Sequence, residues 1–212
     1  MIYDISQELF SCRVWPGDPA PKRDVLADMD KGDIINLTAF SMCAHNGTHL
    51  DAPAHFIKEG KTVTELNPAA YLGDCYLTHH EGDVTAADAR RILGYATEAD
   101  AAQRILIAGK ATVTLEAARV FADAGIKLIG NESQTVGPED APAAVHFLLL
   151  DAEVVLTVWS IAPPIKAPTR PAIAPEIIIV RMITRRTLIP TYFAVLILSP
   201  TTEISYPCLL YL

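Results

Sequence analysis

The feature that most constrains this chain is a short run of metal-binding residue types. Residues 45–55 read HNGTHLDAPAH, so three of the six histidines and one aspartate fall within eleven positions. Imidazole nitrogens and carboxylate oxygens are ligands that Zn²⁺ and Mn²⁺ accept. The glycine and the proline in the run favour a bent loop over a regular helix. A fold that holds this loop in place can therefore bring several of these side chains onto one metal ion.

The spacing within the run predicts a division of roles. His45 and His49 lie one helical turn apart and Asp51 follows closely, so these three side chains can converge on a metal. Pro53 biases the residue before it toward extended backbone, which turns His55 away from the first three. A bound metal lowers the pKa of water, and a nearby imidazole can move protons. The run therefore predicts a metal site with a histidine that faces the substrate.

Two other interpretations of the run remain open at this point. The ligands could form a structural or sequestering metal site in a protein without turnover. Alternatively, Cys43 could act as a nucleophile beside His45. Thiol alkylation abolishes activity only under the second interpretation.

The bulk composition describes an acidic globular chain. Its 212 residues suit one domain, and with half of them hydrophobic there is ample material for a core. The net charge of -8 argues against a nucleic-acid partner, which would need clustered Lys and Arg. We expect no membrane partner, since no apolar run reaches the roughly 18 residues that cross a bilayer. The beginning of the chain lacks signal-peptide features and the cysteines are widely spaced, so we expect a reduced, cytoplasmic protein.

Residues 1–156 predict an α/β fold in which short strands and helices alternate. Thr85, with Asp88 three residues on, is typical of a helix start, and Gly94 and Gly125 are typical of helix ends. We expect a turn at 15–19, helices over 86–93, 115–124 and 142–150, and strands over 2–10, 34–44 (buried), 71–78, 104–108, 127–129 and 152–156. This pattern predicts helical layers around one sheet.

The last 56 residues, 157–212, differ from the rest in composition. They contain no Gly and no Asp, hold 8 of the 15 prolines and carry a net charge of +3, against -11 for residues 1–156. One explanation is a β segment punctuated by proline that needs no glycine. The other is an atypical tail that did not evolve with this domain, for example after a change of reading frame in the gene.

The histidine run is similar to the H-x-G-T-H-x-D-x-P-x-H signature of the cyclase family, which includes kynurenine formamidases and isatin hydrolases. The turn WPGDP at 15–19 resembles that family's aromatic-Pro-Gly-Asp turn, and segments 81–85 and 128–132 fall where the family has comparable ones. The resemblance covers residues 1–156. It implies a single cyclase-like domain with a mixed β-sheet or small barrel flanked by helices, a small-molecule substrate and a homo-oligomer (dimer or tetramer).

The resemblance also implies a set of metal ligands. His45, His49 and Asp51 match the ligands of a first metal, Zn²⁺ or Mn²⁺, and Asp51 can bridge to a second. His146, on the expected helix 142–150, matches a ligand of the second metal; without the resemblance it would be read as a half-buried helix residue. The family places a Glu ligand 12 residues further on, where this chain has Val158. We therefore expect one tightly bound metal and at most a weak second one.

Other residues acquire expected roles in the same way. His55 matches the catalytic acid/base, and Trp15 matches an aromatic wall of the substrate pocket. His79 and His80 match no ligand and are expected at a strand end or in a loop. Glu132 could line the pocket or be a solvated loop carboxylate.

The function that the resemblance implies is hydrolysis of a linear amide, such as an N-formyl aryl amine, by metal-activated water. Opening of a lactone or cyclic amide is the alternative within the family. The missing ligand at Val158 leaves a third possibility, a family member that binds metal but is catalytically impaired.

Overall fold

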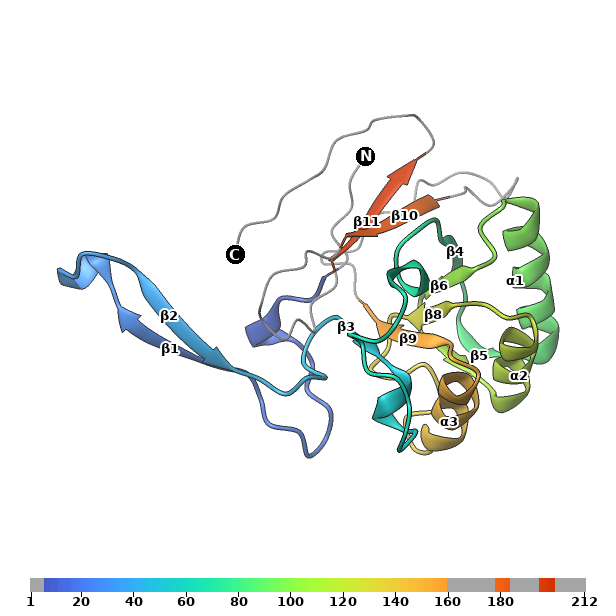
Figure 1. Ribbon diagram of the computed structural model, residues 1–212, viewed down its shortest axis with the longest axis horizontal. Helices are drawn as coiled ribbons and strands as arrows, with labels where there is room; N and C mark the ends of the chain where they lie inside the picture. Colours follow the sequence, from blue (N-terminus) through green and yellow to red (C-terminus); the bar gives the residue numbers. More distant parts are fainter. Residues whose placement is uncertain (1–5, 160–177, 184–194, 201–212) are drawn as a thin grey trace.

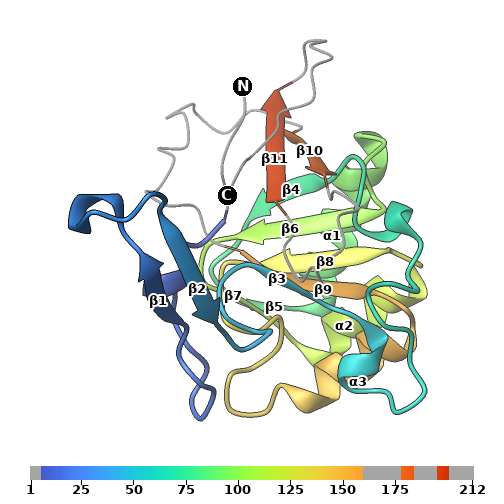
Figure 2. The same cartoon turned by 60° about the vertical axis from the view of Figure 1, so that its left-hand side comes forward.

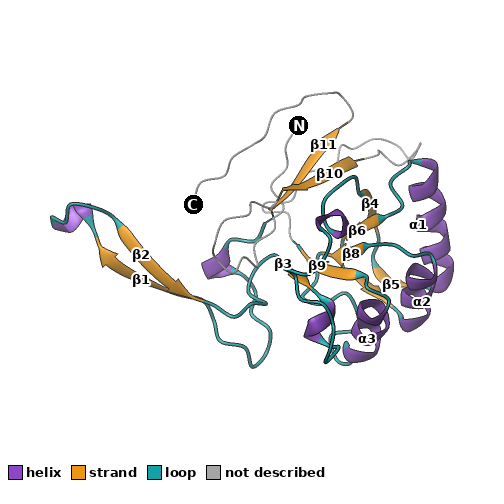
Figure 3. Cartoon of the chain, in the orientation of Figure 1, coloured by secondary structure: helices purple, strands orange, loops and turns teal. Residues whose placement is uncertain are grey.

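The computed structural model describes residues 6–159, 178–183 and 195–200. Figure 1 shows a body of sheet and helices from which one hairpin projects, and Figure 3 gives the same view by secondary structure. No helix among the described residues has both the length and the apolar character to span a membrane.

The body is organised around a five-stranded mixed sheet. Its strands run in the order β3-β9-β8-β6-β4; they are parallel except for the antiparallel pairing of β3 with β9. The bounds are β3 (His49–Asp51), β9 (Val155–Val158), β8 (Leu128–Asn131), β6 (Arg104–Ala108) and β4 (Tyr76–His79). A separate parallel pair, β5 (Gly82–Val84) and β7 (Ala111–Val113), lies nearby (Figure 2). Of the two expected arrangements, the described strands thus form an open mixed sheet.

The α-helices of the described residues flank this sheet on one face, as Figure 1 shows. They are α1 (Ala86–Glu98), α2 (Leu115–Asp123) and α3 (Ala143–Asp151). On β6, Ile105 and Ile107 pack into the helix-side core, while Leu106 packs into the opposite core with Tyr71 and Trp159. Both faces of a mainly parallel sheet are buried in this way, which explains the continuous apolar runs of its central strands. The predicted α/β fold is confirmed.

The helix starts follow the local sequence closely, but one predicted end is wrong. Thr85 and Asp88 form a complete capping box at the start of α1, and Thr114 caps α2. The helix α1 does not stop at Gly94 but continues to Glu98. The buried Ala96 extends the apolar face past the glycine, and this packing offsets the roughly 1 kcal/mol cost of a helical Gly.

The predicted buried strand over 34–44 is wrong in both burial and extent. The strand there is β2 (Leu37–Ser41), which pairs only with β1 (Lys22–Ala27) among the described strands. Neither strand has a buried residue, and Ile34 near the tip is 93% exposed. Hydrophobicity indicated a core strand, but the segment forms a hairpin that leaves the body, with the short 3₁₀ helix η2 (Met29–Lys31) at its end.

The predicted strand over 2–10 is also not seen in its described part. Residues 6–8 have no regular structure and are followed by a 3₁₀ helix, η1 (Leu9–Ser11). Glu8 explains this helix, because its carboxylate accepts hydrogen bonds from the backbone N–H and hydroxyl of Ser11.

The expected boundary at 157 falls inside β9. Thr157 and Val158 are buried strand residues, and Trp159 is buried directly after them. Further along, β10 (Ile178–Ile183) pairs with β11 (Val195–Pro200). The remainder of the expected atypical tail lies outside the described residues.

Candidate metal centre

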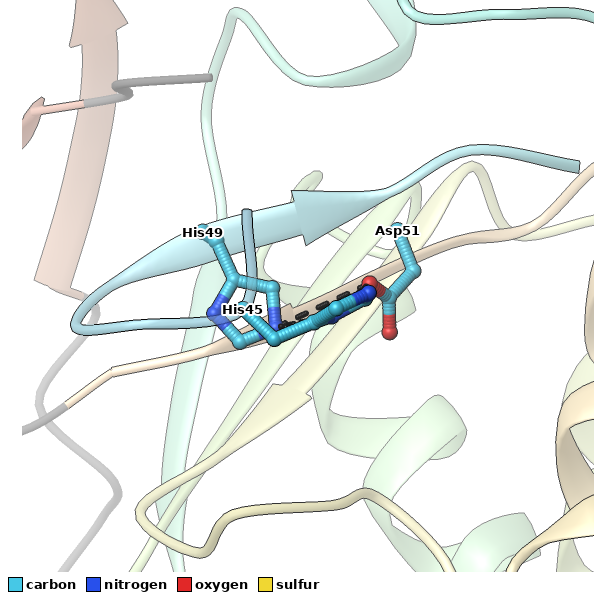
Figure 4. Close-up of side chains that lie close together, drawn as sticks. All are labelled: His45, His49 and Asp51. Carbon is cyan, nitrogen blue, oxygen red and sulfur yellow. Dashed lines mark hydrogen bonds and ion pairs between the residues drawn. The ribbon is translucent and has the colours of Figure 1, made fainter. Parts of the chain in front are cut away.

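The histidine run folds as a turn followed by a strand. Asn46 accepts a hydrogen bond from the Cys43 N–H at 2.8 Å, and Gly47 has a positive φ of 71°, a conformation that favours glycine. The chain then enters β3, where His49 and Asp51 alternate and so point to the same face of the sheet. The turn returns His45 to that face, as Figure 4 shows.

Three donor atoms gather around one point. His45 Nδ1 lies 3.2 Å from His49 Nε2 and 3.3 Å from Asp51 Oδ1, and the last two atoms are 3.6 Å apart. Ligands bonded at about 2.0–2.1 Å in a tetrahedral site lie roughly 3.3 Å from one another. The Oδ1 atom is buried and has no hydrogen bond of proper geometry to a described residue. This group fits a metal ion, which its His and Asp side chains could hold.

Backbone carbonyls orient two of the imidazoles. His49 Nδ1 lies 2.8 Å from the Gly47 carbonyl, and His146 Nδ1 lies 2.9 Å from the Pro142 carbonyl. When Nδ1–H donates to these carbonyls, each Nε2 keeps its lone pair for a ligand. Both Nε2 atoms point toward Asp51. The Nε2 atom of His49 lies 3.6 Å from Asp51 Oδ1, and that of His146 lies 3.8 Å from Asp51 Oδ2.

The electrostatics of the group favour an anionic Asp51 among mostly neutral imidazoles. Burial would raise the pKa of Asp51, but the close imidazoles of His45 and its neighbours outweigh burial and hold this pKa below its ordinary value. Contact with the Asp51 carboxylate raises the pKa of His45. Burial lowers the pKa of His49, which favours the neutral form that binds metals.

His146 lies on the other side of Asp51, and Val158 lines the same pocket. His146 is buried on α3, and its Nε2 is 3.8 Å from Asp51 Oδ2. Val158 is the Cα partner of His49 across β3 and β9, so the two side chains share a face. Val158 stands at the position where the family resemblance implies a Glu ligand. It lines the same pocket, but its side chain has no lone pair to offer a metal.

His55 lies beside the donor group and is not turned away from it. It ends the 3₁₀ helix η3 (Pro53–His55), and its ring centroid is 4.3 Å from that of His45 and 6.4 Å from that of His146. Partial burial and the neighbouring imidazoles lower the pKa of His55, against the opposing effect of Asp51. A neutral imidazole can therefore face the pocket at neutral pH.

The side chains described above line one pocket of about 300 Å³, which is at the lower end of the range for small-molecule sites. They are His45, His49, Asp51, His55, His146 and Val158. Trp15 also lines it, as expected from the 15–19 turn, which is closed by an Asp18 N–H to Trp15 carbonyl bond of 3.0 Å. Sequence reasoning missed several lining residues: Gln7, Arg13, Asp18, Phe56, Gln134 and Thr135.

Some of the missed residues had a signal in the sequence. Asp18 stands in the quoted turn, and its charge adds to the effect of Asp51 in raising the pKa of His45. Gln134 and Thr135 follow β8, and functional loops commonly follow the carboxyl ends of parallel strands. Their Oε1 and Oγ1 atoms are buried without a hydrogen bond to a described residue, so they can pair with a ligand. Gln7 and Arg13 had no signal that spacing or periodicity could reveal.

Four other candidate residues lie outside the lining of this pocket. His79 lies at the end of a strand and His80 in a loop, as expected. His79 contacts the Glu81 carboxylate at 3.2 Å, and His80 contacts the Asp83 carbonyl at 3.0 Å. The carboxylate of Glu132 accepts a 2.6 Å hydrogen bond from the Gly109 N–H, which braces a loop. The Cys43 thiol donates a hydrogen bond to Asp18 at 3.4 Å, so its partner among the described residues is a carboxylate and not His45.

Comparisons with known proteins identify sequence relatives of this chain. Kynurenine formamidase of Sphingopyxis alaskensis is 30% identical over 155 residues, 66% of this chain and 72% of that protein. The kynurenine formamidase of Erythrobacter litoralis is 28% identical over 156 residues, 66% of this chain and 69% of that protein.

Solved structures share the fold. Isatin hydrolase A from Labrenzia aggregata superposes with a TM-score of 0.70 at 17% identity, covering 94% of each chain. A predicted metal-dependent hydrolase from Bacillus stearothermophilus gives 0.65 at 20% identity, covering 93% of this chain and 97% of that one. A family model described as putative cyclase matches residues 3–138. The chain therefore belongs to the cyclase family.

Proposed function

We propose that this protein is a metal-dependent hydrolase that cleaves a linear amide, such as an N-formyl aryl amine. The observation that carries the proposal is the group of three donor atoms, 3.2–3.6 Å apart, at a pocket that also contains His55. The names of the sequence relatives, kynurenine formamidases, support a formamide as the substrate class. Isatin hydrolase among the structural neighbours supports C–N bond hydrolysis more broadly.

In this proposal His45, His49 and Asp51 hold the ion. A bound Zn²⁺ or Mn²⁺ would supply an activated water and polarise the amide carbonyl. The carboxylate of Asp51 offsets the ion's charge.

The protein's own groups carry the proton transfers. His55, neutral because its pKa is lowered, accepts a proton from water in the pocket. It then delivers this proton to the nitrogen of the leaving arylamine. Trp15 lines the pocket, and its ring can stack on the aryl group of the substrate.

Val158 favours a second candidate function. A valine at the position of the expected Glu leaves the pocket without that anionic ligand. A protein that binds one metal without appreciable turnover fits this arrangement. Opening of a lactone or cyclic amide remains the alternative substrate class.

Steady-state hydrolysis separates these functions. Metal-stripped protein is assayed with N-formyl-L-kynurenine, isatin and simple aryl esters, each with and without added Zn²⁺ or Mn²⁺. Metal-dependent turnover of the formamide above the others is expected. Tight metal binding with no turnover of any substrate would favour the second function, and preference for isatin would favour the cyclic amide.

We also propose that the chain forms a homo-oligomer, dimer or tetramer, through the β1–β2 hairpin. An isolated two-stranded hairpin is marginally stable in water, and this one exposes Val25, Leu26, Ile34, Leu37 and Phe40. Self-association would cover these side chains. Light scattering of the wild type and of an Ile34→Ser/Phe40→Ser variant tests this, with a lower mass expected for the variant and an unchanged mass contradicting the proposal.

A further inference from the structure

One aromatic side chain at the pocket has no role in the proposed reaction. Phe56 is a lining residue, and its ring contacts two of the pocket imidazoles. The centroids of the Phe56 and His55 rings are 4.6 Å apart with the ring planes at 89°, and those of Phe56 and His146 are 5.0 Å apart at 35°. Aromatic rings attract one another in edge-to-face and offset geometries at such distances. A single apolar ring thus packs on both histidines.

Phe56 is anchored to the body of the protein. Its backbone N–H donates to the Pro53 carbonyl at 3.1 Å, and the N–H of Ile57 donates to the same carbonyl at 2.8 Å, which closes the turn after η3. The Phe56 side chain packs against the helix-side core. Its ring also meets the ring of Phe147 on α3 edge to face, at 5.1 Å and 83°. Packing on several sides restricts the movement of this ring.

The imidazole of His55 has fewer constraints of its own. His49 and His146 each have an Nδ1 atom at hydrogen-bond distance from a backbone carbonyl, whereas His55 has neither a hydrogen bond nor an ion pair to a described residue. An imidazole that acts as a base is usually oriented by a third group. Here the close ring contacts, with His45 at 4.3 Å and with Phe56 at 4.6 Å, are what can orient it.

We propose that Phe56 is a positioning residue, whose ring orients the His55 imidazole toward the pocket. This inference rests on the proposed amide hydrolysis, in which His55 transfers protons. Misplacement of a catalytic group by about 1 Å can cost about 100-fold in rate. Loss of the Phe56 ring therefore acts through His55 and lowers kcat, while the binding of the substrate is retained.

Kinetics separate this positioning role from direct contact with the substrate. Phe56→Leu keeps an apolar side chain but removes the ring, so kcat for N-formyl-L-kynurenine should fall by about 10–100-fold with little change in KM. Phe56→Tyr keeps the ring and should recover most of the lost kcat. Metal content, measured on the same preparations, should stay constant. A raised KM with unchanged kcat would make Phe56 a wall that binds the substrate, and would overturn the proposal.

The matched control is Phe147→Leu. Phe147 belongs to the same group of rings, but it is not a lining residue of the pocket, and its ring contact among the described residues is with Phe56 and not with a histidine. Phe147→Leu should therefore leave kcat and KM close to those of the wild type. If it lowers kcat as much as Phe56→Leu does, general loss of packing explains both variants and the proposal fails.

A structural readout keeps this inference separate from the proposed function. In Zn²⁺-loaded protein with ¹³C-labelled histidine rings, NMR detects the ring current of an aromatic neighbour on each imidazole. Phe56→Leu should shift the resonances of His55 and His146, which His55→Ala and His146→Ala assign, and Phe147→Leu should shift neither. An unshifted His55 resonance in Phe56→Leu would overturn the proposal. The expected shifts in a protein whose wild type hydrolyses no amide would refute the proposed function alone.

Discussion

The two oxygens of Asp51 face different surroundings. Oδ1 lies 3.3 Å from His45 and 3.6 Å from His49, so three donor atoms form a compact group there. Oδ2 faces His146 at a longer 3.8 Å, and the nearby strand position opposite His49 is occupied by Val158. The Oδ1 side thus has the donors for a metal, while the Oδ2 side has the single imidazole of His146 among the described contacts.

The difference reflects how each side is built. The Oδ1 side comes from seven consecutive positions, so one turn and the start of β3 suffice to assemble it. The Oδ2 side needs α3, 95 positions further along the chain, to approach β3. The fold brings His146 to 3.8 Å from Oδ2, and the pocket residue Val158 has no lone pair to offer as a further ligand.

The largest expected effect is loss of the metal from the Oδ1 side. His49→Ala removes an oriented ligand and should lower metal content after dialysis by well over tenfold, since loss of even an outer partner costs about 10–100-fold in affinity. Turnover should be lost with the metal. Elemental analysis measures this, with His79→Ala as an exposed control outside the pocket. Unchanged stoichiometry in His49→Ala would rule out this site.

The next prediction distinguishes residues that bind the metal from the residue that transfers protons. His55→Ala should retain the metal, because His55 is outside the compact donor group, yet lower kcat by about 10²–10⁴-fold. Metal content and turnover are measured on the same preparation. Parallel loss of metal with His49→Ala would make His55 a ligand instead.

The sequence predicted the elements that depend on local or periodic signals. The capping residue Thr85 placed the start of α1, and the strand predicted over 104–108 is β6. The interpretation failed at 34–44, where hydrophobicity cannot distinguish a core strand from an exposed hairpin. Tertiary structure decides which surface a strand packs against, and the periodicity of the sequence cannot predict that surface.

The site shows the same limit. Clustering of residue types identified His45, His49 and Asp51 as a possible metal group, which the geometry supports. The approach of His146 needed the family resemblance, because 95 residues separate it from Asp51. The pocket position of Arg13 had no local signal, since it depends on a segment distant from the histidine run.

A substitution at Val158 can make the two sides more alike. Register places residue 158 opposite His49 on the pocket face, so Val158→Glu should put a carboxylate into the pocket that Asp51 and His146 also line. We expect a second metal to bind at least about tenfold more tightly, as a further anionic oxygen ligand is supplied. Titration with Mn²⁺ followed by paramagnetic resonance measures both sites. Val158→Gln, of similar size but neutral, is the control.

The smallest expected effect comes from His146→Ala in the otherwise unchanged chain. If the tight metal belongs to the Oδ1 side, losing the His146 imidazole should change its affinity by less than about tenfold, because 3.8 Å from Oδ2 is too long for a hydrogen bond to the Asp51 carboxylate. In the Val158→Glu background the same substitution should abolish the gained second metal, because the carboxylate then lacks its imidazole partner. The two backgrounds are compared by competition with a chromophoric chelator. If His146→Ala releases the tight metal from the parent chain as strongly as His49→Ala does, His146 is a ligand of that metal, and the tight site spans both oxygens of Asp51.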